Sequence, residues 1–140
     1  MLGVVTRLLV LLLALATLPP RLAAQGHEHP AGRTVLVKMV DKSASEFAFE
    51  PAQIRVQPGD TVRFVQTGIA PHNVEFRKMP TAAKLGAARM GPFLTTKNQT
   101  YDLVIDNRFA PGEYEYVCTP HVGMGMKAAL VVASPTSEST

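Results

Sequence analysis

This chain of 140 residues has no tryptophan and a single cysteine, Cys118. One cysteine excludes an internal disulfide, so the fold must be stabilised by burial of apolar side chains or by a bound ion. The four histidines, at 27, 29, 72 and 121, are too few for a cluster of several copper ions but enough for one metal site. The length accommodates one domain and leaves no room for a second.

Charge of either sign is also sparse. The sequence has 14 Lys and Arg against 11 Asp and Glu, a formal net charge of +3. Removal of Arg7 and Arg21 with an export segment leaves 12 against 11, or +1. Because no long basic run is present, we expect no nucleic-acid partner.

The first 24 residues have the composition of a secretory signal peptide. Arg7 precedes an apolar run from Leu8 to Leu18, which a pair of prolines then ends. The run is too short to span a bilayer comfortably, and Ala24 supplies a small residue before a cleavage site. We predict cleavage after Ala24, a periplasmic or extracellular protein, and no membrane span after cleavage. The alternative is an uncleaved N-terminal anchor.

Two polar segments flank the predicted domain, which we place at 34–133, with a linker at 25–33 and a tail at 134–140. After cleavage the chain would begin Gln25-Gly26-His27, and a free amine with histidine at the third position chelates Cu(II) in a square plane. The alternative is a solvated arm in which His27 and His29 bind nothing.

From Thr34 onward, short runs of alternating apolar and polar residues are separated by turn residues, which is typical of an antiparallel Greek-key β-sandwich and thus of an all-β fold. The strands are expected at 35–40, 53–57, 61–64, 73–77, 101–105, 113–116 and 128–132. The first is apolar at both parities, so we expect it to be covered on both faces. Only Thr81 to Met90 has helical composition, weakened by Gly86, and we predict one short helix there, in a crossover loop.

Side chains alternate between the two faces of a strand, so neighbours reveal the face of a polar residue. Cys118 shares the parity of Tyr114 and Tyr116, on the core side at the end of its strand. The same rule places His72 and Met126 on the core side. Three potential metal ligands are therefore predicted to point inward at strand ends.

His121 lies three residues after Cys118, in a glycine-rich loop that leads to Met126. Taken singly, these residues have ordinary interpretations: a small buried cysteine, a core methionine and a satisfied core histidine. Together with His72 they supply a thiolate, two imidazoles and a thioether. This is the donor set of a mononuclear blue-copper centre, a trigonal His₂Cys plane with a long axial methionine.

Two segments carry these residues, APHNVEF (70–76) and PGEYEYVCTPHVGMGMK (111–127), and a third, FAFEPAQIRVQPGDTVRFV (47–65), precedes them. These segments resemble the small blue copper proteins called cupredoxins, in particular the plastocyanin and pseudoazurin group, and the resemblance runs from about Phe47 to Val132. The resemblance implies one type 1 copper ion, cycling between Cu(I) and Cu(II), with His72, Cys118, His121 and Met126 as its ligands. It also implies that Asn73 ties the two ligand loops together and helps to hydrogen-bond the thiolate.

An apolar rim around His121 is the predicted docking surface for redox protein partners, with His121 as the electron exit. The rim comprises Pro71, Pro120, Val122 and Met124. Such contacts are small and transient, and we expect a monomer. The alternative to a docking surface is a set of scattered apolar loop residues without function.

Two methionines of this loop could be the axial ligand. Met124 is nearer to His121 in sequence, but parity favours Met126.

Other functions use similar residues. Structural zinc sites prefer several cysteines, and a thioether is a poor zinc ligand. A thiol enzyme with Cys118 and His121 would lack a third orienting group. Four protein ligands would leave copper no open position for a substrate, so we predict that the protein is not an enzyme. The remaining alternative is an extracytoplasmic copper carrier that delivers metal rather than electrons.

Overall fold

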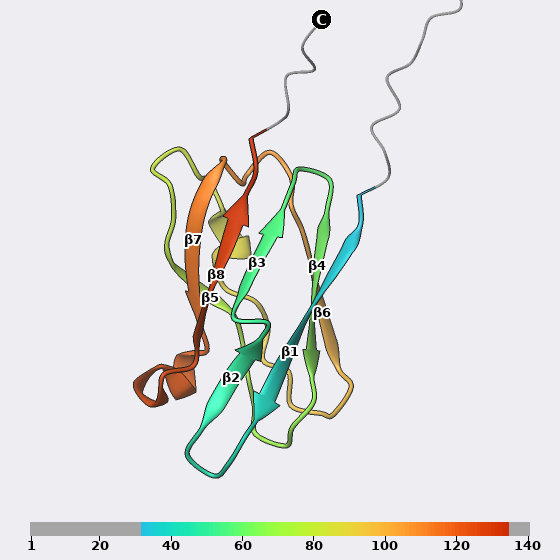
Figure 1. Ribbon diagram of the computed structural model, residues 1–140, viewed down its shortest axis with the longest axis vertical. Helices are drawn as coiled ribbons and strands as arrows, with labels where there is room; N and C mark the ends of the chain where they lie inside the picture. Colours follow the sequence, from blue (N-terminus) through green and yellow to red (C-terminus); the bar gives the residue numbers. More distant parts are fainter. Residues whose placement is uncertain (1–31, 135–140) are drawn as a thin grey trace, which may run out of the picture.

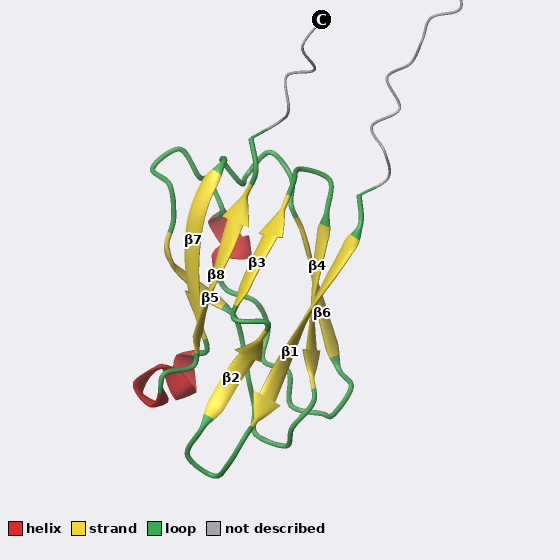
Figure 2. Cartoon of the chain, viewed as in Figure 1, coloured by secondary structure: helices red, strands yellow, loops and turns green. Residues whose placement is uncertain are grey.

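The computed structural model describes residues 32–134, and within them two four-stranded sheets pack face to face (Figures 1 and 2). The predicted signal peptide, His27, His29 and nearly all of the C-terminal tail lie outside the described residues. The first sheet has the order β2 (Phe47–Glu50), β1 (Thr34–Asp41), β4 (Thr61–Gln66) and β6 (Thr100–Val104). The second has the order β3 (Gln53–Val56), β8 (Lys127–Val132), β7 (Gly112–Val117) and β5 (Glu75–Lys78).

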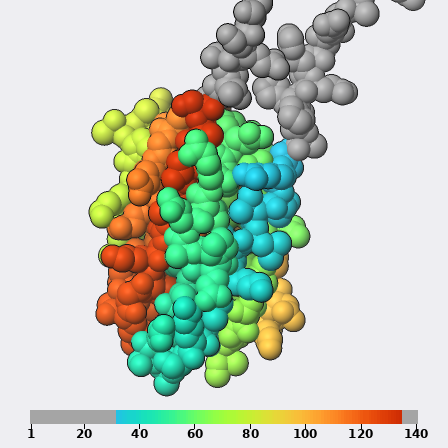
Figure 3. All heavy atoms as spheres, in the orientation of Figure 1, coloured from blue at the N-terminus to red at the C-terminus, as the bar shows by residue number. Residues whose placement is uncertain are grey.

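The all-β sandwich is confirmed, but its strands are not all antiparallel. β1 pairs with β4, and β3 with β8, in parallel, whereas the other pairings in both sheets are antiparallel. Side-chain alternation has the same period in both kinds of pairing, so the sequence pattern does not encode strand direction. The chain passes from the first sheet to the second between β2 and β3. In the space-filling view this green segment lies between β1 (blue) and β8 (red) (Figure 3).

The core is formed by the inner faces of the two sheets and is rich in aromatic rings. The Tyr116 ring lies 4.9 Å from that of Phe49 and 5.6 Å from that of Phe64, centroid to centroid, in edge-to-face geometry. β1 contributes Val37 and Met39 to this core, while Leu36 is 51% exposed. The prediction that this strand is covered on both faces is therefore wrong, since no further layer lies outside it among residues 32–134.

The predicted helix over Thr81 to Met90 is much shorter than its composition indicates. Only a 3₁₀ turn forms there, η1 (Gly86–Arg89), and Gly86 has φ of 54°. A residue in the left-handed region interrupts an α-helix at that point. A second 3₁₀ turn, η2 (Thr119–Met124), lies between β7 and β8 with a proline near its start, and the sequence pattern did not predict it.

The strand directions bring several chain segments to one end of the sandwich. β1 and β7 end there and β2, β5 and β8 begin there, with η2 beside the end of β7 (Figure 1). The two ends of the described chain lie at the opposite end. In the described part of the chain, no helix has the length and apolarity needed to cross a membrane.

Candidate metal centre

Three ligating atoms converge at this end of the sandwich. Sγ of Cys118 lies 3.5 Å from Nδ1 of His72 and 3.4 Å from Nδ1 of His121, and the two nitrogens are 3.1 Å apart. Cys118 and His72 are fully buried, and His121 is partly exposed. The structure therefore brings together three of the predicted ligands from chain segments that are 46 and 49 residues apart.

Each of these side chains is placed by regular backbone pairing. Cys118 directly follows β7 and continues its inward parity. His72 exchanges backbone hydrogen bonds with Leu94, at 3.1 Å and 2.7 Å, which pair the two residues as an isolated antiparallel bridge. His121 lies in η2, where its N–H donates to the carbonyl of Cys118 at 3.2 Å. Hydrogen bonds within the protein thus fix the backbone of the residues that carry the donor atoms.

Met126 lies at the end of the loop that contains His121 and is hydrogen-bonded to both His121 and Cys118. Its N–H donates to the carbonyl of His121 at 3.2 Å, and its own carbonyl accepts from the N–H of Cys118 at 3.1 Å. Its side chain is fully buried, whereas that of Met124 is 51% exposed. The burial matches the predicted inward direction of Met126 and places Met124 on the surface.

The surroundings set the charge of the donors. Burial raises the pKa of the Cys118 thiol, and hydrogen bonds from the backbone of Asn73 and His121 oppose that shift. Burial lowers the pKa of His121 below its ordinary value. At neutral pH, His121 is therefore a neutral imidazole with a free lone pair. A metal ion binding here must displace the thiol proton, so binding releases a proton.

Asn73 connects the two segments that carry the ligands. Its side-chain oxygen accepts from the N–H of Thr119 at 2.9 Å and from the Thr119 hydroxyl at 2.9 Å. Asn73 is fully buried and Thr119 is partly exposed, so these bonds are partly shielded from water. The Asn73 side-chain nitrogen has no hydrogen-bond partner among residues 32–134.

Two residues of the site were missed by the sequence analysis. The Asp41 carboxylate lies 2.7 Å from Nε2 of His72, and the ring of Phe47 stacks on the imidazole of His121 at a centroid distance of 3.9 Å. Asp41 shares the inward parity of Val37 and Met39, and this is the signal in the sequence that identifies it, as it does for His72. Burial would raise the pKa of Asp41, yet its hydrogen bonds from Ala70, His72 and Ile69 lower it below the ordinary value.

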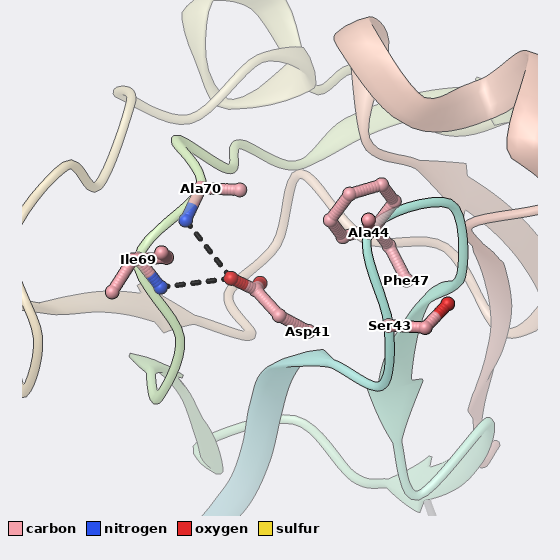
Figure 4. A pocket seen from close by; sticks show the side chains of 6 residues that line it. All are labelled: Asp41, Ser43, Ala44, Phe47, Ile69 and Ala70. Atoms are coloured by element: carbon pink, nitrogen blue, oxygen red, sulfur yellow. Dashed lines mark hydrogen bonds between the residues drawn. The ribbon is translucent and has the colours of Figure 1, made fainter.

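The predicted apolar rim is exposed as a whole. Val122 is 36% exposed and Met124 51%, and Pro71 and Pro120 are exposed as well. Ile69, which the sequence analysis did not include, is 89% exposed and precedes Pro71 by two residues. Ile69, Phe47 and Asp41 also line an open hollow beside the centre (Figure 4).

The donor set fits copper. A buried thiol sulfur and two imidazole nitrogens face one another, with a buried thioether in the same loop. The sulfur of Cys118 and the ligating nitrogens of His72 and His121 all lie within 4.8 Å of one another. Mixed soft sulfur and imidazole donors suit both copper oxidation states, whereas structural zinc sites prefer several thiolates.

Comparison with known proteins agrees with this chemistry. Residues 35–133 match the family model described as copper binding proteins, plastocyanin/azurin family. A plastocyanin of Synechococcus is 36% identical over 107 residues, which cover 73% of this chain and 75% of that protein.

Solved structures give the same result. The oxidised plastocyanin of Dryopteris crassirhizoma has a TM-score of 0.58 at 30% identity, covering 70% of this chain and 99% of its own. A pseudoazurin from Sinorhizobium has a TM-score of 0.51 at 39% identity, covering 74% and 76%. Fold, donor set and sequence agree that this chain is a cupredoxin: it belongs to the plastocyanin/azurin family of copper-binding proteins, and its cofactor is copper.

Proposed function

We propose that this protein is an exported one-electron carrier whose single type 1 copper ion is held by His72, Cys118, His121 and Met126. The observation that carries the proposal is the convergence of Cys118 Sγ with the Nδ1 atoms of His72 and His121, at mutual distances from 3.1 Å to 3.5 Å. Bound copper would supply one-electron cycling between Cu(I) and Cu(II).

The protein's contribution is a set of donors that stays in place. Backbone hydrogen bonds fix the segments of His72, His121 and Met126, and two of the three converging side chains are fully buried. Electron transfer is favoured when the donor positions do not have to change with the charge of the metal. A site held by pairing between strands and by a 3₁₀ turn meets that requirement.

The electron would leave through His121, the most exposed of the four proposed ligands. The apolar rim of Pro71, Pro120, Val122 and Met124 surrounds this exit and would dock redox partner proteins outside the cytoplasm, the protein itself being a monomer. A small apolar contact suits a partner that must dissociate after each transfer. The signal peptide predicted at 1–24 supports export. A buried site with four protein donors supports electron transfer rather than catalysis on a substrate.

The test is to add Cu(II) to the purified mature protein. We expect an intense blue thiolate-to-copper absorption band and a narrow copper hyperfine splitting, both abolished in Cys118→Ser. A colourless protein, or a spectrum that survives Cys118→Ser, would refute the proposal. A copper carrier is the competing function. It predicts fast loss of Cu(I) to a competing chelator and slow electron exchange, whereas the electron carrier retains its metal and exchanges electrons rapidly.

A further inference from the structure

Asp41 ends β1 beside the proposed copper ligands, and its carboxylate is fully engaged. Oδ2 accepts from the N–H groups of Ile69 at 2.8 Å and Ala70 at 2.9 Å (Figure 4), and Oδ1 lies 2.7 Å from Nε2 of His72. The Asp41 side chain is 17% exposed, and that of His72 is fully buried. One carboxylate therefore holds both the imidazole and the loop that leads to it.

We propose that Asp41 is a positioning residue for the copper site: it holds His72 in the tautomer that presents a lone pair to the metal, and it lowers the reduction potential. The part of this inference that concerns the potential rests on the proposed function. The part that concerns the tautomer is a property of the protein without metal.

The tautomer follows from the chemistry of the pair. A neutral imidazole carries one N–H donor and one acceptor nitrogen, and an ionised carboxylate can only accept. The contact with Asp41 therefore places the proton on Nε2 of His72. Nδ1 is left with its lone pair, and it is Nδ1 that faces Sγ of Cys118 and Nδ1 of His121.

The potential follows from the charge. A metal-binding histidine carries its N–H on the nitrogen that does not bind the metal. A carboxylate that accepts from this N–H makes the imidazole a stronger ligand, and loss of such a partner typically weakens metal binding about 10–100-fold. Stronger electron donation from the His72 imidazole and the negative charge of Asp41 both favour Cu(II), the more positive of the two ions. Asp41 should therefore stabilise Cu(II) more than Cu(I).

Gly68 makes room for this carboxylate. A Cβ atom at position 68 would overlap Cγ and both oxygens of Asp41. Gly68 does not have a positive φ, so its lack of a side chain matters for space and not for backbone conformation. Gly68→Ala is therefore a variant that displaces the Asp41 carboxylate without deleting it.

The experiment begins with the metal-free protein. Long-range ¹H–¹⁵N spectra report which imidazole nitrogen carries the proton, and we expect the Nε2–H form for His72. The copper-loaded protein is then compared with Asp41→Asn, Asp41→Ala and Gly68→Ala by potentiometry and by Cu(II) titration against a competing chelator. Asp102→Asn is the control, since it removes an exposed carboxylate that pairs with Arg63.

We expect the Asp41 and Gly68 variants to keep the blue band, to bind Cu(II) about 10–100-fold more weakly, and to lose less affinity for Cu(I). A tenfold larger loss for Cu(II) than for Cu(I) equals a rise of about 59 mV in the one-electron potential. Asp102→Asn should keep the original potential and affinity.

Two results would overturn the inference. One is a wild-type His72 protonated on Nδ1. The other is that Asp41→Asn and Gly68→Ala lower the stability of the protein but leave its potential and Cu(II) affinity at the wild-type values. Asp41 would then only hold the loop in place. Should Asp41→Ala fail to fold, these measurements still decide. A wild-type protein that forms no blue centre would instead refute the proposed function, and the tautomer result would be unaffected.

Discussion

The ring of Phe47 stacks on the imidazole of His121, with centroids 3.9 Å apart and an interplanar angle of 21°. The same ring meets His72 edge-to-face at 5.6 Å, so one residue of β2 contacts both histidines of the centre. His121 lies on the short turn η2, and the stack gives its ring a fixed neighbour. Phe47 thus couples the first sheet to the loop that carries three of the proposed ligands.

Replacement of Phe47 by leucine keeps an apolar side chain but removes the stack. We expect the metal-free protein to lose about 1–2 kcal/mol of unfolding free energy, from the lost aromatic pair and imperfect repacking. Urea unfolding followed by fluorescence or circular dichroism measures this. Phe93→Leu is the matched control, because Phe93 is 49% exposed and should cost little. Equal losses in the two variants would show that the stack contributes nothing.

The assignment of the axial ligand rests on two methionines of opposite exposure. Met126→Leu should raise the reduction potential and alter the copper hyperfine splitting, because the loss of one donor destabilises Cu(II). Met124→Leu should leave both unchanged, since Met124 is 51% exposed whereas Met126 is fully buried. Potentiometry and electron paramagnetic resonance on the two copper-loaded variants test the assignment, and the reverse pattern would transfer the axial position to Met124.

Much of this centre could be predicted because strands impose a period of two. Parity placed Cys118, His72 and Met126 inside, and all three are fully buried. The same rule applied to Asp41 would have placed its carboxylate beside the core. Asp41 is hard to predict because a carboxylate at a strand end is usually exposed. Its partner His72 lies 31 residues away, and the local sequence does not indicate this contact.

Other features depend on contacts that a local pattern does not contain. β2 spans only Phe47–Glu50, too short for its alternation to stand out. The stack of Phe47 on His121 joins residues from different sheets and turns, so it follows from the packing of the whole chain. The parallel pairing of β1 with β4 likewise depends on the path of the chain through space and not on the side chains of either strand.

The hydrogen bonds of Asn73 to Thr119 should hold the two ligand-bearing segments together. Asn73→Ala deletes the shared acceptor and leaves the Thr119 N–H without it, at a cost of about 1–3 kcal/mol. Thr119→Val deletes only the hydroxyl donor and should cost about 1 kcal/mol. Unfolding of the metal-free variants measures both. If Asn73→Ala costs no more than Thr119→Val, the backbone bond at Thr119 does not contribute.

The rim around His121 is tested by a charge placed at its edge. Val122→Lys should slow electron exchange with a protein partner at least several-fold, because docking would have to bury an ammonium group in an apolar contact. The blue band should stay unchanged, since Val122 is 36% exposed and the proposed ligands are untouched. Stopped-flow exchange kinetics measure the effect, and wild-type rates in the variant would remove the docking proposal.

Tyr116 lies in the centre of the aromatic core, and its hydroxyl has no hydrogen-bond partner among the described residues. A buried hydroxyl without a partner is costly, so Tyr116→Phe should stabilise the protein by about 1 kcal/mol at neutral pH. Tyr114 offers the contrast. Its hydroxyl donates to the carbonyl of Ala110 at 2.7 Å, so Tyr114→Phe should destabilise. Opposite signs in urea unfolding are the expected result.

The same hydroxyl should shape the alkaline limit of stability. Burial raises the pKa of Tyr116 far above its ordinary value, whereas in the unfolded chain this phenol ionises near pH 10. Above about pH 10 the unfolded state therefore holds fewer protons than the folded state, and the unfolding free energy falls as pH rises. Tyr116→Phe abolishes this contribution, so its decline between pH 10 and 12 should be shallower. Parallel declines would show that Tyr101 and Tyr114, whose pKa values are also raised by burial, dominate instead.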